Sequence, residues 1–348
     1  MLRDDIVKEL EENRGVPLSG QYLADKYNVS RNAVWKTVNA LKKSGYVIVS
    51  GKNSGYYLAE GNDIISEQGI RHFLGSDDNE LPIKVYDVID STNNEAKRLM
   101  ISDDVSRMLL VANQQTAGRG RLGRNFYSPA DSGIYMSLIY RVPGGVKNPM
   151  MITMAAAVAV VRAIEKLTDI RPGIKWVNDI FVGDKKVCGI LSEAVTDLET
   201  GMAENIVVGI GINMKKSNFP EELRSIASSL YAEDVTRNHM IAEVTNNLLE
   251  LFGSFDAEVF MPEYISHNIV VGKRVGFERI ASGKTVQKAG SDDGADKASS
   301  DESQLMNAVP VYEKVYGTVK EVCSDGALLV VSDDGTEERI FTGEIKMR

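Results

Sequence analysis

The spacing of apolar positions divides the chain into three stretches and a linker: residues 1–62, 63–80 (the linker), 81–268 and 269–348. The first stretch has apolar residues at helical spacing, at Val34, Val38 and Leu41. Ser19 and Ser30 are typical N-cap residues ahead of two helices, and residues 46–58 alternate as a hairpin does. Two helices, a turn and a hairpin predict a winged helix-turn-helix.

The middle stretch interleaves alternating segments with helical ones. Strands are predicted over 83–88, 108–112, 134–139, 187–194 and 206–212. A short helix is predicted from Thr92 to Met100, a long apolar one from about Pro149 to Leu167, and another from His239 to Phe252. This order predicts an α+β domain with a mixed sheet whose helices gather on one face.

The last stretch consists mostly of short strands with turns between them. Residues 317–322 and 326–331 are predicted as strands, which suits a small β-barrel of the SH3 type. Residues 281–307, approximately, are rich in Ser, Asp, Gly and Lys and nearly lack apolar residues. Such a segment cannot bury a core, so a disordered insert is expected there.

Composition narrows the class of protein. With 43% hydrophobic and 26% charged residues, the 348-residue chain is typical of a globular protein. No apolar run reaches the roughly 20 residues that cross a bilayer, so no membrane contact is expected. The two cysteines, Cys188 and Cys323, lie far apart, which predicts free thiols and a cytoplasmic location. The three histidines and two cysteines have no close spacing, which argues against a zinc site, whereas a carboxylate magnesium site stays open.

Charge is distributed unevenly along the chain. The net charge is −9, yet residues 26–59 contain no acidic residue and several basic ones. This basic module on an acidic chain predicts DNA contact by the winged helix. Trp35, beside the apolar stripe, is expected to pack in the core rather than stack on DNA. The predicted DNA contacts are Ser30, Arg31, Asn32, Lys36, Asn39 and Lys52.

The segment Gly118–Arg124 carries the most chemistry. Its glycines fit G-x-G-x-x-G, the fingerprint of a dinucleotide-binding turn. That fingerprint must open a helix, whereas residues 125–133 here are typical of a loop. Three arginines on a glycine-rich segment therefore predict a flexible loop that closes over an anionic ligand.

Further motifs accompany this loop. They are Ser91–Asn93, Gln115, Lys175–Asp179, Lys186–Leu191, Gly209–Met214 and Gly343–Ile345 ahead of Arg348. In this order they resemble the bifunctional biotin protein ligases that also act as biotin operon repressors. The segment Ser30–Lys36 is similar to the winged helix of that repressor class. The resemblance implies a catalytic domain of the class II synthetase-like kind, with ATP and biotin as substrates and Mg²⁺ as the metal.

The resemblance also implies roles for particular residues. Catalysis would fall to Arg119, Arg121, Lys186 and Asp179, with Asp179 either binding magnesium or orienting the acceptor amine. Biotin would contact Ser91, Thr92, Asn93, Gln115, Arg119, Gly120, Arg121, Lys186, Gly189, Gly209 and Gly211, and the apolar wall would include Ile190 and Leu191. ATP would contact Arg121, Arg124, Phe126, Lys175, Asn178, Asn213 and Arg348. Two positions depart from the family: Val177 replaces a usual proline, and Phe126 stands where some relatives have tryptophan.

The implied partners are the carrier domain of a biotin-dependent carboxylase and operator DNA. The adenylate would order the arginine loop and favour a homodimer that binds the operator. Two other interpretations stay open: a lipoate ligase, which shares the fold and the adenylate chemistry, and a non-enzymatic biotin-sensing repressor.

Overall fold

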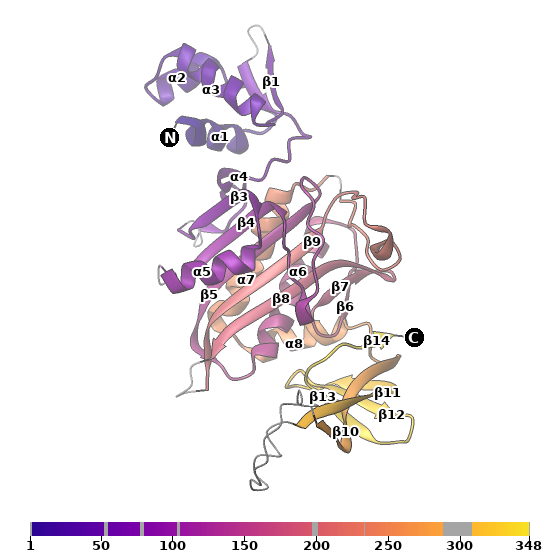
Figure 1. The fold of residues 1–348 in the computed structure, drawn as a ribbon. Helices are drawn as coiled ribbons and strands as arrows, with labels where there is room; N and C mark the ends of the chain where they lie inside the picture. The colour runs from indigo at the N-terminus through magenta and orange to yellow at the C-terminus, as the bar shows by residue number, and fades with distance from the viewer. Residues whose placement is uncertain are drawn as a thin grey trace, which may run out of the picture. The chain divides into compact units, whose positions relative to one another are not determined.

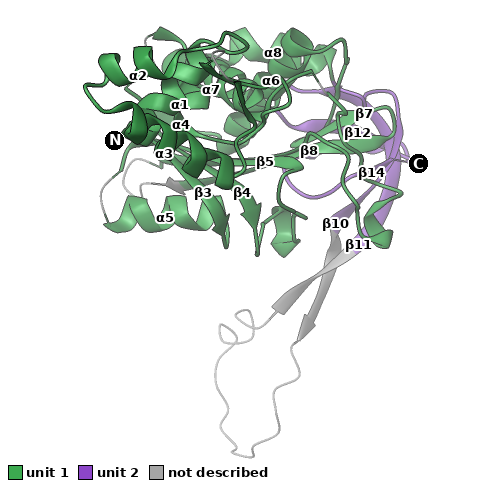
Figure 2. Ribbon diagram, turned by 90° about the horizontal axis from the view of Figure 1, so that it is seen from above, with its two compact units in different colours: residues 1–267 green, residues 268–348 purple. Residues whose placement is uncertain are grey.

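The computed structural model describes residues 2–51, 55–76, 80–102, 105–196, 201–232, 234–287 and 308–347. The chain divides into two compact units, Met1–His267 and Asn268–Arg348, coloured separately in Figure 2. The elements and their order along the chain are labelled in Figure 1.

The first unit begins with the predicted winged helix-turn-helix. It contains α1 (Leu2–Glu12), α2 (Gly20–Lys26), α3 (Arg31–Lys43) and the hairpin of β1 (Ile48–Gly51) and β2 (Gly55–Leu58). Ser19 and Ser30 cap α2 and α3, as predicted: each hydroxyl accepts the backbone N–H three residues ahead. Val34, Val38 and Leu41 are buried, which confirms the helical stripe.

The segment from Asp63 to Arg71 is hydrogen-bonded to the rest of the first unit. It contains α4 (Glu67–Arg71), and Asp63 accepts hydrogen bonds from the backbone N–H and the Nε of Arg237 at 2.7 and 2.8 Å. The same guanidinium donates to Asn113 Oδ1 at 2.9 Å and to the carbonyl of Gly133. The start of the predicted linker is therefore anchored to the strands that lead to the candidate site.

A mixed sheet forms the centre of the first unit. In the described part of the chain its strands run in the order β3 (Ile83–Ile89), β4 (Arg107–Gln115), β5 (Gly133–Val146), β9 (Ala203–Asn213), β8 (Lys185–Thr196), β7 (Asp179–Val182) and β6 (Gly173–Lys175). β3 and β4 are parallel, whereas the other neighbouring pairs are antiparallel. The mixed sheet agrees with the prediction.

Helices cover both faces of this sheet, so the prediction that they gather on one face was wrong. Ala96 in α5 (Thr92–Ser102) packs with Ile139 of β5, whereas Phe252 in α7 (Arg237–Ser254) lies against Tyr140. Consecutive strand residues point to opposite faces. Figure 2 shows α5 on one side of the sheet, and α6 (Pro149–Leu167), α7 and α8 (Ala257–Ser266) on the other. Short 3-10 turns lie at Arg121–Gly123 and Glu221–Leu223.

The second unit is an antiparallel sheet. Its described strands follow the order β13 (Glu337–Ile340), β12 (Leu328–Ser332), β11 (Ala308–Val322), β10 (Arg274–Gln287) and β14 (Lys346–Met347), with no pairing between β13 and β14 in those residues. The predicted insert at about 281–307 begins too early, because residues 281–287 continue β10 through its pairing with β11. The remainder of the predicted insert, residues 288–307, lies outside the described residues. Within the described residues, no helix is long and apolar enough to cross a membrane.

Candidate active site

Glycines from two neighbouring strands form the floor of a pocket on the face of the sheet that carries α5. Gly189 of β8 pairs directly with Gly211 of β9, and Gly209 pairs with Leu191. A Cβ on Gly209 would lie 2.0 Å from Asn93 Oδ1, and one on Gly211 would lie 2.4 Å from the Phe126 ring. Side chains from other elements thus reach the sheet backbone because these positions lack a Cβ.

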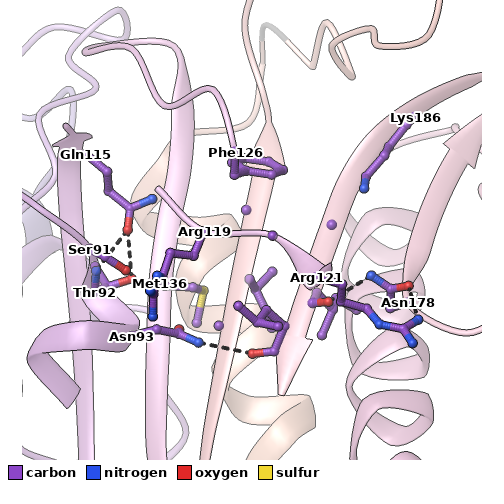
Figure 3. Close-up of a pocket in the computed structure, with 17 residues that line it drawn as sticks. Ser91, Thr92, Asn93, Gln115, Arg119, Arg121, Phe126, Met136, Asn178 and Lys186 are labelled. Carbon is purple, nitrogen blue, oxygen red and sulfur yellow. Dashed lines mark hydrogen bonds between the residues drawn. The ribbon is translucent and has the colours of Figure 1, made fainter. Parts of the chain in front are cut away.

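The N-terminus of α5 supplies a polar corner of this pocket. Ser91, Thr92 and Asn93 line it together with Gln115, which ends β4 (Figure 3). Gln115 Oε1 accepts the backbone N–H of Thr92 at 2.9 Å and lies 3.2 Å from Thr92 Oγ1. Its Nε2 donates to Ser128 Oγ at 3.0 Å, so the amide is held in one orientation.

Asn93 has its polar atoms engaged by the protein. Its amide nitrogen donates to the carbonyl of Leu191 at 3.2 Å and to Glu193 Oε2 at 2.9 Å. Its oxygen accepts the hydroxyl of Ser137 at 2.6 Å. Asn93 lines the pocket, but both of its amide hydrogens are used within the protein.

The arginine loop lies across this pocket and opens no α-helix, as predicted; it contains one short 3-10 turn at Arg121–Gly123. Phe126 N donates to the carbonyl of Gly118, and Gly120 N donates to the carbonyl of Arg124 at 2.7 Å, which closes the loop on itself. Arg119 reaches Asn94 Oδ1 on α5 at 3.3 Å, whereas Arg121 donates to Asn178 Oδ1 at 3.0 Å. The two guanidinium groups therefore stand on opposite sides of the pocket that they line (Figure 3).

Lys186 brings a further cation to the pocket. Its Nζ lies 2.6 Å from Asp179 Oδ1, in an ion pair between β8 and β7. The ammonium also lies 3.1 Å from where a Cβ of Gly189 would be. Lys186 is thus held over the glycine floor by Asp179, which is not itself among the residues that line the pocket.

The structure assembles most of the predicted site residues. The pocket is lined by Ser91, Thr92, Asn93, Gln115, Arg119, Gly120, Arg121, Phe126, Met136, Asn178, Lys186, Gly189, Ile190, Leu191, Gly209, Ile210 and Gly211. Arg124, Lys175, Asp179 and Asn213 do not line it. Lys175 lies with its Nζ 5.6 Å from the centre of the Phe181 ring, and Asn213 donates to the carbonyl of Ser228. Arg348 lies outside the described residues.

Sequence reasoning missed the residues that hold the pocket-lining side chains in place. Ser137, Glu193 and Ser128 bind the polar corner, and Met136 lines the pocket. Ser137 is a polar residue within the apolar run of β5, and this is the one sequence signal that could have marked it. The structure shows that it is fully buried, so its hydroxyl needs a hydrogen-bond partner inside the protein.

Burial and hydrogen bonding shift the pKa of titratable groups near the pocket. Burial raises the pKa of Glu193, but hydrogen bonds from Lys97 and Asn93 lower it by more, so that pKa lies below its usual value. Burial raises the pKa of Tyr135 to about 12 and raises that of the Cys188 thiol strongly. Glu193 is therefore ionised at neutral pH, whereas Cys188 is a protonated, unreactive thiol.

The exposed face of α3 carries most of the predicted DNA contacts. Arg31, Asn32 and Lys36 are exposed, and Asn39 is partly exposed. Trp35 is 55% exposed, so the prediction that it packs in the core was wrong: the stripe at Val34 and Val38 turns the intervening Trp35 outward. Lys52, predicted at the wing tip, lies outside the described residues.

Comparison with known proteins agrees with this geometry. Residues 85–213 match the biotin/lipoate A/B protein ligase family, and residues 3–57 match an HTH domain. A biotin protein ligase from Aquifex aeolicus, solved in complex with biotin and ATP, has a similar fold, with a TM-score of 0.58 and 25% identity over 77% of this chain and 98% of that chain. The fold and pocket thus define a protein ligase of the biotin/lipoate class that carries a helix-turn-helix domain.

Relatives of at least 30% identity that cover more than two thirds of this chain specify the family within that class. The bifunctional ligase/repressor BirA of Bacillus subtilis is 37% identical over 99% of this chain and 98% of its own length. The Escherichia coli protein of the same name is 30% identical over 71% of this chain and 76% of its own length. The chain belongs to the family of bifunctional ligase/repressor BirA proteins.

Proposed function

We propose that this protein activates biotin with ATP to biotinyl-5'-AMP and transfers the biotin to a lysine of a biotin carboxyl carrier domain. The observation that carries the proposal is one pocket with two chemically distinct ends. Ser91, Thr92 and Gln115 give a polar corner suited to a cyclic urea, and Arg121 and Lys186 lie toward the far end. Biotin has a urea ring at one end and a carboxylate at the other. The family relationship supports the same assignment.

The cations would act on the charge that the reaction brings together. The biotin carboxylate must approach the α-phosphate of ATP, and fixed positive charge offsets their repulsion. Lys186, Arg119 and Arg121 would supply that charge. As the carboxylate oxygen bonds to phosphorus and pyrophosphate leaves, Lys186 would neutralise the added negative charge. The ordered loop would exclude water, because an acyl-adenylate hydrolyses readily.

For the nucleotide we propose Arg121, Arg124, Phe126, Lys175, Asn178, Asn213 and Arg348 as contacts. Phe126 already lies on the pocket floor, against Gly211, where its ring could stack on a base after the loop moves. Asp179 supports catalysis by holding Lys186 at 2.6 Å.

A magnesium ion would arrive with ATP rather than occupy a preformed protein site. No group of three or more His, Cys, Asp or Glu side chains suited to a metal occurs in the described residues. Magnesium often keeps its waters and binds substrate phosphates with one carboxylate, which a single aspartate such as Asp179 would fit. Bound there, it would screen the phosphate charge.

We further propose that the protein represses transcription, with operator DNA contacted by α3 and biotinyl-5'-AMP as corepressor. The exposed Arg31, Asn32 and Lys36 support this assignment. The adenylate would order the arginine loop and favour a homodimer in the cytoplasm. Arg121→Ala should then weaken both adenylate retention and operator binding. Unchanged operator affinity in a variant that no longer retains the adenylate would contradict the link.

As domains we propose residues 1–62 for DNA binding, 81–268 for catalysis on a class II synthetase-like sheet, and 269–348 as a small SH3-like barrel. The linker would be 63–80. The second unit, which begins at Asn268, supports the last boundary, and the HTH match over residues 3–57 supports the first.

Biotin-dependent exchange between ATP and labelled pyrophosphate tests substrate and reaction together. Exchange with biotin but not with lipoate is expected, and lipoate-dependent exchange would favour a lipoate ligase. Lys186→Met should abolish the exchange, while Lys185→Met, next to it on β8 but outside the pocket lining, should not. Biotin binding without exchange or transfer to a carrier domain would favour a non-enzymatic sensor.

A further inference from the structure

Polar side chains that support the pocket form a chain of close polar contacts that begins at a carboxylate. Glu193 accepts from Asn93 Nδ2 at 2.9 Å, and Asn93 Oδ1 lies 2.6 Å from Ser137 Oγ. Ser137 Oγ lies 2.7 Å from Thr92 Oγ1, which lies 3.2 Å from Gln115 Oε1. The chain thus runs from β8, through α5 and β5, to the pocket corner at the end of β4.

The carboxylate at one end decides which way Asn93 faces. An ionised carboxylate can only accept hydrogen bonds, and Glu193 accepts from Asn93 at one oxygen and from Lys97 Nζ, 2.9 Å away, at the other. The amide nitrogen of Asn93 must therefore face Glu193, and the oxygen must face Ser137. The carbonyl of Leu191, 3.2 Å from the same nitrogen, favours the same orientation.

Counting hydrogen-bond donors fixes the positions of the two hydroxyl protons, those of Ser137 and Thr92. The oxygen of Asn93 carries no hydrogen, so the 2.6 Å contact requires the hydroxyl proton of Ser137. Ser137 has no second proton, so the 2.7 Å contact requires that of Thr92. Both hydroxyl protons are then used in the two shortest contacts.

The consequence falls on Thr92, which lines the pocket. Its longer, 3.2 Å contact with Gln115 Oε1 has no hydroxyl proton left, and that oxygen is satisfied by the backbone N–H of Thr92 at 2.9 Å. Toward the pocket, the hydroxyl of Thr92 offers lone pairs only. A ligand that donates N–H to this oxygen is accepted, and one that can only accept is rejected.

We propose that Glu193 is a positioning residue that fixes the direction of these hydrogen bonds, so that Thr92 selects a ligand with an N–H donor. The inference rests on the proposed function, because biotin presents the N–H groups of a cyclic urea, whereas the lipoyl ring has none. Glu193 acts through Asn93 and Ser137, and it does not line the pocket itself.

Glu193→Gln is the smallest change that removes this directional control. Lys97 would hold the amide oxygen of the new glutamine, which turns its NH₂ toward Asn93. An Asn93 amide that flips in response would donate to Ser137, and Ser137 would donate to Thr92. The freed Thr92 proton would then oppose a ligand N–H. Glu95→Gln on α5 is the matched control, because Glu95 bonds to Arg98 and Tyr86, away from the pocket.

The test compares the affinities of the full-length protein for biotin and for a cyclic carbonate analogue whose urea N–H groups are replaced by oxygen. By calorimetry, the unaltered protein and Glu95→Gln should prefer biotin by at least about tenfold, or ~1.4 kcal/mol. In Glu193→Gln the preference should fall at least threefold, mainly through weaker biotin binding. Equal weakening of both ligands, or an unchanged preference, would overturn the proposal, because a general structural defect acts on both.

A second measurement needs no ligand and separates this inference from the proposed function. In protein labelled with [¹⁵N]asparagine, the side-chain NH₂ signal of Asn93 is assigned by its loss in Asn93→Asp. That signal should shift as Glu193 is protonated in acid, and the shift should be absent in Glu193→Gln. An NH₂ signal of Asn93 that does not shift when Glu193 is protonated would overturn the proposal even if biotin binds. Failure of the unaltered protein to bind biotin, with the NMR response present, would refute only the proposed function.

Discussion

Gly209 gives the sharpest test of the pocket geometry, because its missing side chain is the space that Asn93 occupies. In Gly209→Ala the new Cβ would lie 2.0 Å from Asn93 Oδ1 and 2.7 Å from its Cγ. The amide would have to retreat by about 1 Å to reach even 3.0 Å, the lower limit of real Cβ contacts. Its bonds to Leu191, Glu193 and Ser137 prevent such a movement without loss.

The expected losses of folding stability and of biotin affinity in Gly209→Ala follow from those contacts. Overpacking a tight core costs about 1–3 kcal/mol. Each lost hydrogen bond adds about 0.5–1.5 kcal/mol. A destabilisation of about 3 kcal/mol is therefore expected, which is a large part of a typical total of roughly 5–15 kcal/mol. Because the displaced amide also disturbs Ser137 and Thr92, biotin affinity should fall about tenfold or more, equivalent to ~1.4 kcal/mol.

Two other glycines serve as comparisons in the same denaturant-unfolding and calorimetric assays. In Gly211→Ala the clash is with the Phe126 ring at 2.4 Å, and a side chain on the arginine loop can move aside. Its stability should change by less than about 1 kcal/mol. Gly253→Ala, in α7 with open space around the added Cβ, should stabilise by about 0.5–1 kcal/mol. If Gly209→Ala were as stable as the unaltered protein and bound biotin equally well, the role assigned to Asn93 would be wrong.

Three further predictions concern other regions of the protein. Trp35→Ala should weaken operator binding at least about fivefold in a fluorescence titration, with an unchanged unfolding midpoint, because Trp35 is 55% exposed on α3; a lowered midpoint would argue for a packing role. Arg237→Met removes the guanidinium that bonds to Asp63, Asn113 and the carbonyl of Gly133, while Lys215 Nζ stays 2.6 Å from Asp63, and it should cost about 3 kcal/mol in denaturant unfolding; a loss under about 1 kcal/mol would contradict the anchoring role. Burial raises the pKa of Glu9, but hydrogen bonds from Lys26 and two tyrosines lower it by more, so the net shift is downward. The stabilisation from Glu9 is thus present above the usual carboxyl pKa and lost as pH falls through the lowered value, and Glu9→Gln should flatten this acid dependence of the winged helix, measured by circular dichroism.

The sequence alone determined the features that depend on local pattern. Serine caps and the stripe of Val34 and Val38 predicted the winged helix, since caps and helical periodicity act within a few residues. The arginine loop was correctly predicted to lead into a strand rather than a helix, because residues 125–133 carry turn signals. The resemblance of ordered motifs was enough to predict most residues that line the pocket.

Other features depended on which elements become neighbours. Trp35 lies beside a core stripe in sequence, yet helix rotation leaves it exposed, and only the packed structure reveals that face. Strand spacing in sequence does not say which side of a sheet a helix will cover, so the expectation of helices on one face missed that α5 lies opposite α7. The composition of residues 281–287 hides their place in β10, because the pairing of residues 285–287 with β11 is set by a distant segment of the chain.

Only the tertiary structure shows which residues hydrogen-bond to the side chains that line the pocket. Asn93 and Glu193 are one hundred positions apart, and Ser137 reaches both Thr92 and Asn93 from a third element. Sequence pattern records which residue types are present and how local segments fold. The direction of a hydrogen bond and the fit of an amide over Gly209 depend on distances of a few tenths of an ångström between strands, which sheet register and packing set only in the folded chain.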